Sequence, residues 1–199
     1  MITDLIYYLI GFIIVLVLVI FFLLVWFSEK RIKKNFEIIY NNLALKRKGT
    51  LIKKINTTFL EFTYENSPIE LATHPGDRDL PSFIRVSATV QNPQNHQLKI
   101  SPKMFGSNIG KDHGMKNISI GNVDFDTKFI VKCNNELFPA SLLNSQIQNN
   151  LFSLRKKYPT TTLYSNQLII NIPDYNMTSE EYDLLIDTAL LFIDRLKAI

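Results

Sequence analysis

Residues 5–27 read LIYYLIGFIIVLVLVIFFLLVWF, a run of 23 residues without a charge, a proline or an amide. An α-helix rises about 1.5 Å per residue, so this run can cross the roughly 30 Å apolar core of a bilayer. In lipid the backbone finds no other hydrogen-bond partners, which makes a helix the expected form of a single span. Tyr7, Tyr8 and Trp26 lie near the two ends, where amphipathic rings favour the membrane–water interface. The sequence therefore predicts a transmembrane helix over residues 5–27.

Two other interpretations of this run, a buried core helix and a cleaved signal peptide, fit less well. A soluble core helix rarely has more than about 14 wholly apolar residues. A signal peptide has a basic N-terminal region, a shorter apolar stretch and small residues before the cleavage site. Residues 1–4 carry no basic side chain, and no A-x-A pattern follows the run. We therefore expect a signal anchor that stays attached, with residues 1–4 as a short external N-terminus.

Basic residues lie on one side of this segment only. No lysine or arginine precedes it, whereas residues 28–54 contain nine basic residues and two acidic ones. The positive-inside rule then places the N-terminus outside and residues 28–199 in the cytoplasm, as in a single-pass protein of a bacterial inner membrane. We expect the bilayer and its anionic head groups to be partners of the basic side chains that follow the run directly, which are Lys30, Arg31, Lys33 and Lys34.

The same basic segment accounts for the net charge of +4 of the 199-residue chain, because residues 55–199 carry a net charge of −2. A nucleic-acid surface would need basic side chains spread over the domain with aromatic residues between them. We therefore expect no nucleic-acid partner. The single cysteine, Cys133, excludes an internal disulfide, and with three scattered histidines it excludes most structural zinc sites. No cofactor is predicted.

Residues 28–49 are predicted to form a basic juxtamembrane helix that ends at Gly49, after a basic last turn. Four apolar residues recur at helical spacing, namely Ile32, Phe36, Ile39 and Leu43. This helix either continues the span as a stalk or lies on the membrane surface as an amphipathic helix. We favour the stalk, because no glycine or proline interrupts residues 12–48.

Residues 50–199 are predicted to form one cytoplasmic α+β domain built on an antiparallel sheet. Apolar and polar residues alternate from Thr50 onward, which is typical of antiparallel strands with one face exposed. Residues 160–164 and 167–172, joined at Ser165-Asn166, predict a hairpin. The other strands are expected over residues 59–64, 84–90, 98–100, 118–120 and 125–133, the last with Phe125, Phe129, Val131 and Cys133 on one face.

Two helices are expected to cover one face of this sheet. The first begins at Pro139 and ends before Pro159, and its buried stripe consists of Ala140, Leu143, Ile147, Leu151 and Leu154. The second begins at Thr178, where Glu181 completes a capping box. Its buried face consists of Tyr182, Leu185, Ile186, Ala189, Ile193 and Leu196.

Candidate chemistry is confined to a few carboxylates and one histidine. His74, Asp77 and Asp79 lie in a polar turn that could bind an ion or a phosphate. Asp124 and Asp126 lie two residues apart on one face of a predicted strand, where a carboxylate pair could hold Mg²⁺. Turn aspartates also serve simply to accept hydrogen bonds from turn amides. No catalytic residue and no metal are therefore assigned.

The segment Phe125-Asp126-x-x-Phe129-x-Val131, followed by Ala140 and Leu142-Leu143, resembles a pattern in uncharacterised bacterial membrane proteins of unknown function. Those proteins join apolar segments to a cytoplasmic α+β domain, so the resemblance implies the same organisation here. It covers roughly residues 118–155 and implies no activity, cofactor or catalytic residue.

These patterns predict a single-pass membrane-anchored interaction or scaffold domain, an accessory subunit of a bacterial inner-membrane assembly with membrane-protein partners. Tethering raises the effective concentration of the domain for partners at the membrane surface, and a half-covered sheet offers them a face or an edge. The alternative is a membrane-tethered ligand- or metal-binding domain, hydrolytic or not, that uses the loop aspartates. The sequence assigns no enzymatic activity.

Overall fold

A computed structural model describes residues 16–24, 36–54, 57–74, 76, 78–79, 81–103, 114–173 and 176–199. The chain divides into two compact units, Met1–Asn42 and Leu43–Ile199.

In the first unit, residues 16–24 and 36–42 are helical. The apolar side chains from Leu16 to Leu24 are exposed by 48% to 68%. Among the described residues, no helix combines the length and the apolar character needed to cross a membrane. The remainder of the span predicted from the sequence, residues 5–15 and 25–27, lies outside the described part of the chain.

The described part of the second unit contains one sheet of nine strands, and every neighbouring pair is antiparallel. Its order is β1-β2-β3-β4-β9-β8-β5-β7-β6, so the late hairpin β8–β9 lies between β4 and β5. The α+β class and the antiparallel sheet predicted from the sequence are confirmed. The strands are β1 (Thr50–Lys53), β2 (Thr58–Tyr64), β3 (Ser67–His74), β4 (Phe83–Thr89), β5 (Leu98–Pro102), β6 (Lys116–Ile118), β7 (Phe129–Cys133), β8 (Thr160–Tyr164) and β9 (Gln167–Ile172).

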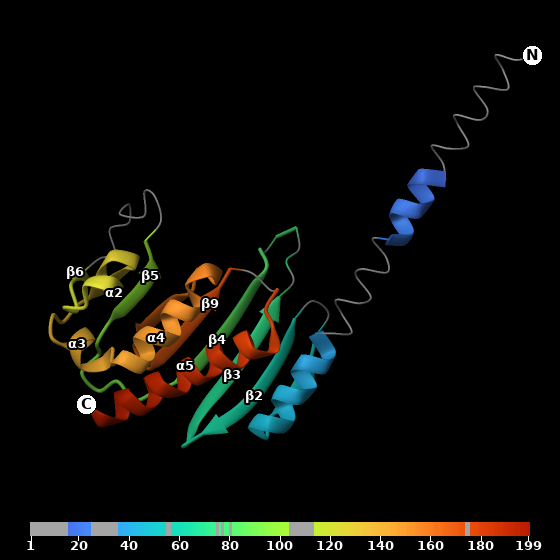
Figure 1. Cartoon of the computed structure of the whole chain (residues 1–199). Helices are drawn as coiled ribbons and strands as arrows, with labels where there is room; N and C mark the ends of the chain where they lie inside the picture. The colour runs from blue at the N-terminus through green and yellow to red at the C-terminus, as the bar shows by residue number, and fades with distance from the viewer. Residues whose placement is uncertain are drawn as a thin grey trace, which may run out of the picture. The chain divides into compact units, whose positions relative to one another are not determined.

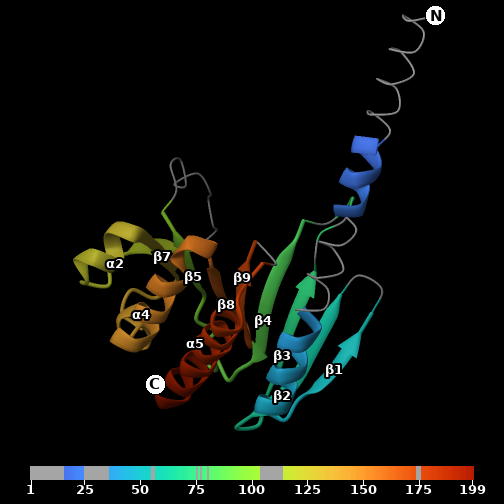
Figure 2. The same ribbon diagram turned by 45° about the vertical axis from the view of Figure 1, so that its right-hand side comes forward.

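The helices of the second unit lie on one face of this sheet, with α4 and α5 packed across it in both views (Figure 1, Figure 2). The alternation of buried and exposed residues along the strands agrees with this one-sided cover. The helices are α2 (Val123–Lys128), α3 (Phe138–Leu142), α4 (Ser145–Leu154) with a 3₁₀ turn at Arg155–Lys157, and α5 (Ser179–Ala198).

The core lies between this face and the helices. The strand registers place one residue from each of seven consecutive strands in a single buried row, made of Leu60, Leu71, Val86, Ile170, Thr161, Ile100 and Val131. Helix α5 packs on this face through Tyr182, Leu185, Ile186, Ala189, Phe192 and Ile193. All of these except Phe192 belong to the predicted buried face, whereas the predicted Leu196 is only half-buried. The predicted capping box of Thr178 and Glu181 is confirmed as well.

Thr161 is the one polar side chain in this row. It is fully buried, and within the described part of the chain its hydroxyl has no hydrogen-bond partner. We expect Thr161→Val to raise the free energy of unfolding by about 1 kcal/mol, because valine keeps the shape and removes a buried, unsatisfied hydroxyl. Urea unfolding measures the change, with Thr162→Val on the opposite face as the matched control. A destabilised Thr161→Val variant would contradict this account of the core.

The strand predicted over residues 125–133 is wrong in its first half. Residues 123–128 form helix α2, and the strand β7 begins at Phe129. The side chain of Asn122 caps the helix by accepting hydrogen bonds from the backbone N–H of Asp124 and Phe125. This local cap outweighs the period-two alternation that predicted a strand.

The single helix predicted from Pro139 is two helices. Leu143 ends α3 in a non-helical conformation (φ −84°, ψ 73°), and Asn144 then caps α4 by accepting from the backbone N–H of Ile147. Because the chain turns here, Ala140 is exposed rather than part of the buried stripe. The later members of that stripe are buried as predicted: Leu143, Ile147, Leu151 and Leu154.

Residues 43–47 form the last turn of a helix that ends at Lys48 and Gly49. Gly49 lies so close to β2 that a Cβ atom would stand 2.7 Å from the carbonyl oxygen of Glu61. Arg47 lies against α5, where its guanidinium bonds Asp183 at 3.0 Å and Asp187 at 2.7 Å. Part of the basic charge that follows the apolar run is thus neutralised within the domain.

Candidate functional site

Among the predicted aspartates that the structure describes, Asp126 has a structural role. Asp124 and Asp126 lie on helix α2 rather than on one face of a strand. The carboxylate of Asp126 accepts hydrogen bonds from the hydroxyl of Ser119 (2.6 Å) and from the backbone N–H of Ile120 (3.1 Å) and Gly121 (3.2 Å). These bonds hold the turn that precedes α2, so both oxygens of Asp126 are occupied by the fold itself.

His74 is buried at the end of β3 and stacks on Phe83, with ring centroids 5.5 Å apart. Its Nδ1 accepts a hydrogen bond from the backbone N–H of Gly76 at 3.1 Å. Asp79 lies in an exposed bend, and Asp77 lies outside the described residues. Four strands separate β3 from β7 in the sheet. The turn that follows His74 and helix α2, which precedes β7, are therefore far apart along the sheet.

Within the described ranges, no group of three or more His, Cys, Asp or Glu side chains is placed to hold a metal ion. The buried thiol of Cys133 has a raised pKa, caused chiefly by desolvation. The predicted membrane-interface residues Tyr7, Tyr8, Trp26, Lys30, Arg31, Lys33 and Lys34 lie outside the described part of the chain.

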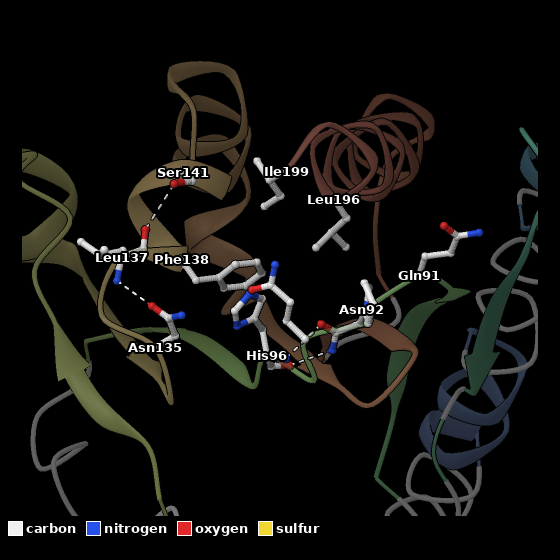
Figure 3. Close-up of a pocket in the computed structure, with 11 residues that line it drawn as sticks. Gln91, Asn92, His96, Asn135, Leu137, Phe138, Ser141, Leu196 and Ile199 are labelled. Atoms are coloured by element: carbon white, nitrogen blue, oxygen red, sulfur yellow. Dashed lines mark hydrogen bonds between the residues drawn. The ribbon is translucent and has the colours of Figure 1, made fainter.

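A pocket of about 230 Å³ lies where the β4–β5 connection, the segment entering α3 and the last turn of α5 meet (Figure 3). Its centre is apolar, and amides and a hydroxyl surround the opening. The lining residues are Gln91, Asn92, Pro93, Gln94, His96, Asn135, Leu137, Phe138, Ser141, Leu196 and Ile199.

Asn92 fixes one wall of the pocket. Its side-chain N–H groups donate to the carbonyl oxygens of His96 (2.9 Å) and Ser165 (2.5 Å), and its carbonyl accepts from the backbone N–H of His96 (3.0 Å). This side chain therefore stabilises the β4–β5 connection through His96 and links it to the turn of the β8–β9 hairpin through Ser165. Asn92 is only 7% exposed, so these bonds replace the water that it would otherwise bind.

His96 and Phe138 form the floor, with their rings stacked and the centroids 3.9 Å apart (Figure 3). Burial lowers the pKa of His96 below its ordinary value, because desolvation disfavours the charged imidazolium. None of the described residues lining the pocket is an aspartate, a glutamate, a lysine or an arginine.

Two further features define the opening. Leu137 stands at the rim with 80% of its side chain exposed, and Ile199 is 49% exposed. On the α5 side, the guanidinium of Arg195 donates to the carbonyl oxygen of Ser141, which joins the last turns of α5 to the end of α3. A pocket whose floor is formed by a phenyl and an imidazole ring and whose rim carries amides suits a partly apolar group, such as an aliphatic or aromatic side chain next to its own backbone.

Sequence reasoning missed this pocket, because its residues come from three segments that lie far apart in the sequence, residues 91–96, 135–141 and 196–199. The Asn- and Gln-rich stretch from Gln91 to Gln97 marks a loop, but nothing local indicates what faces it. Only the sheet order, which inserts β8–β9 beside β4, brings α5 and the α3 segment over this loop.

The chain is similar to known proteins in fold but not in sequence. No protein-family model matches the chain, and no curated protein matches it in sequence. Among solved structures, the crystal structure of the mycobacterial trehalose monomycolate transport factor A, TtfA, is similar at a TM-score of 0.55. The alignment has 7% sequence identity and covers 80% of this chain and 93% of that chain. A likeness at this identity shows a shared fold.

Proposed function

We propose that this protein is a single-pass, membrane-anchored interaction domain without catalytic activity of its own, an accessory subunit of a bacterial inner-membrane assembly. Residues 5–27 form the anchor, the basic side chains after them face anionic head groups, and the domain from Thr50 onward lies in the cytoplasm. The pocket floored by His96 and Phe138 receives an uncharged side chain of a membrane-protein partner.

The pocket is the observation that carries this proposal. The described lining contains one titratable side chain, His96, and no aspartate or glutamate beside it that would orient it for general acid–base chemistry. Recognition needs an apolar anchor site with hydrogen-bonding groups around it, which Phe138, Leu196 and the surrounding amides provide. The exposed Leu137 extends this apolar surface beyond the opening.

The structural neighbour, a transport factor for trehalose monomycolate, shares the fold over most of both chains. This likeness supports the α+β architecture of the proposed domain and assigns it no role. The ligand in the name of that protein is not transferred to this chain, because fold alone does not carry a substrate.

Topology is tested with the whole chain. A reporter fused after Ile199 that is active only in the cytoplasm should be active in membrane-bound protein that resists alkaline extraction. A reporter that is active only after export should stay silent. Activity of the exported reporter, or release of the chain by alkaline extraction, would contradict the anchoring part of the proposal.

Partner recognition is tested by photo-crosslinking in intact cells from a probe residue placed at Leu137. We expect a discrete adduct with one membrane protein, and we expect Leu137→Asp to reduce co-purification of that protein at least about tenfold, because a charge at the rim disfavours desolvation of the pocket. Val123 is the matched control, because it is 77% exposed and lies on α2, outside the pocket lining. Equal adducts from both positions, or none from Leu137, would exclude this pocket as the binding site.

A further inference from the structure

One end of the sheet carries a group of exposed basic side chains. At this end the registers bring the last residues of β1, β3, β5 and β9 beside the first residues of β2, β4, β7 and β8. Helix α4 ends here and α5 begins here, because α4 precedes β8 and α5 follows β9. We call it the basic end, after its exposed side chains Lys54, Arg85, Lys128, Arg155 and Lys156.

Two of these cations lie over phenylalanine rings on the face of the sheet that carries no helix. Lys54 Nζ is 4.7 Å from the ring centroid of Phe59, and Arg85 Cζ is 4.8 Å from that of Phe83. Phe59 and Phe83 each precede a core residue in their strands, so their side chains point to the opposite face. Both rings are half-buried, and the cations over them are exposed. Each pair therefore presents an apolar ring together with a positive charge.

A third pair of this kind lies on the side of the basic end that the helices cover. Lys128, the last residue of α2, places its Nζ 5.0 Å from the ring centroid of Phe152 on α4. Arg155 and Lys156 follow in the 3₁₀ turn after α4. A hollow of about 400 Å³ lies among these four side chains and Asp124. The basic end therefore has cations and aromatic rings on both of its sides.

The charge of the basic end is not neutralised within the described part of the chain. There, no carboxylate forms an ion pair with any of its five named cations, and a ring attracts a cation without cancelling its charge. Two carboxylates of this end are engaged in the fold. Asp126 bonds the turn before α2, and Glu181 bonds the backbone N–H of Thr178 and pairs with Lys157. The described residues of this end thus present a positive surface.

The opposite end of the sheet differs in charge. There Lys116 pairs with Glu136 at 3.2 Å, and Lys197 pairs with Glu65 at 3.0 Å. The candidate pocket also lies at that end, because two of its segments follow the last residues of β4 and β7. The domain is therefore polarised along its strands, with the pocket at one end and the cation–ring pairs at the other.

We propose that the basic end docks on the surface of an anionic phospholipid bilayer, with its cations on head-group phosphates and its phenylalanine rings against the boundary of the acyl chains. Each basic side chain near an anionic membrane surface strengthens binding roughly fivefold. Phenylalanine next to lysine or arginine is typical of surfaces that lie in the membrane interface, and a cation can reach the phosphates while its aliphatic part stays on apolar groups.

The proposal deepens the proposed function and rests on it for the tether, because an anchor at residues 5–27 keeps the domain within reach of such a surface. Docking also gives the pocket a definite height. Strands of five to seven residues are roughly 17–23 Å long, so the pocket would stand about 20 Å from the head groups. A partner then reaches the pocket with a segment that extends this far from the bilayer.

The test uses the full-length chain in nanodiscs of phosphatidylcholine with about 30% phosphatidylglycerol. A fluorophore is attached at Ser153→Cys, in the last turn of α4, or at Gln94→Cys, which is exposed at the opposite end. The native Cys133 is buried and should not react. A lipid with a nitroxide on its head group should quench the Ser153 label several times more strongly than the Gln94 label. This quenching should disappear in discs of phosphatidylcholine alone and weaken at about 0.5 M salt.

Two double variants separate a local effect from one of net charge. Arg155→Glu/Lys156→Glu should weaken docking at least about 25-fold, because two attractions become repulsions. Lys48→Glu/Lys116→Glu is the matched control, since it changes the net charge equally at the opposite end and should dock like the wild type. All four side chains are exposed, and circular dichroism checks the fold. The comparison of the two lipid compositions needs neither variant and stays valid if one fails to fold.

Equal quenching of the two labels, equal quenching of the Ser153 label in anionic and neutral discs, or equal docking of the two double variants would each overturn the proposal. A chain that does not enter the discs would instead contradict the anchor of the proposed function. Docking is then measured on preformed vesicles of the same two lipids with the same labels, where an unquenched Ser153 label overturns the proposal. The failure of docking and the failure of the anchor are thereby distinguished.

Discussion

Replacing Phe125 by alanine is expected to lower the free energy of unfolding by about 4 kcal/mol, the largest effect that we predict for a single substitution. Phe125 is fully buried on α2. Its ring stacks on Phe129 with centroids 4.5 Å apart and meets the edge of Phe152 at 5.5 Å. Removing it leaves a cavity between α2, β7 and α4 and ends two aromatic contacts.

Denaturant unfolding measures this loss, and Val123→Ala is the matched control. Val123 lies on the same short helix but is 77% exposed, so its truncation should cost less than about 0.5 kcal/mol. The free energy should fall with little change in its dependence on denaturant. A cost for Phe125→Ala as small as that of the control would show that α2 does not pack on the domain through this ring.

Replacing Asn92 by alanine is expected to cost about 3 kcal/mol. The substitution removes three hydrogen bonds at once and leaves the carbonyl oxygens of His96 and Ser165 and the backbone N–H of His96 without their buried partner. Because the same bonds shape one wall of the pocket, partner crosslinking from Leu137 should fall as well. Thermal unfolding and the crosslinking yield measure the two effects separately.

Gln94→Ala is the control for Asn92, because Gln94 lines the same pocket but is exposed. Its loss should change stability by less than about 0.5 kcal/mol. Asn92→Asp provides a second comparison, since a carboxylate cannot donate to the two carbonyl oxygens and should destabilise the domain at least as much as alanine. An Asn92→Ala variant with the same stability as the wild type would mean that water replaces the three hydrogen bonds.

The elements that the sequence predicted well are those determined by local patterns. The β8–β9 hairpin has the predicted bounds, because alternation and the Ser165-Asn166 turn act within a dozen residues. Helix α5 begins at the predicted capping box, because Thr178 and Glu181 form it between themselves. Such elements need no information from the rest of the chain.

Helix α2 shows why other predictions were wrong. Phe125, Phe129, Val131 and Cys133 alternate as in a strand, and all four are buried, but the first belongs to a helix. Alternation over five residues does not separate a short helix from a strand extension. The difference comes from Asn122 and Asp126, whose side chains bond the backbone of this turn. The sequence pattern suggests a metal site at Asp126 instead, because the backbone partners of its carboxylate are defined only in the folded turn.

The pocket required the order of the strands, which no local pattern supplies. The sequence predicts that Glu61, Lys99 and Lys132 are strand residues, but it does not predict β3, which carries Glu70, and the alignment of these residues across the sheet depends on every register. One register shift would move these side chains to the other face. The surface proposed to bind a partner therefore depends on the order and register of the strands and not on a local sequence motif.

The position of the β8–β9 hairpin has a consequence for how the protein is made. As the chain leaves the ribosome, β1 to β4 can pair in sequence, and β5 can pair with β7, but these two halves share no neighbouring strands. Their inner edges, β4 and β5, stay unpaired until residues 160–172 emerge and join them. Unpaired strand edges invite wrong pairing with other chains. Newly made copies would thus be most prone to misassembly just before the central strands are added.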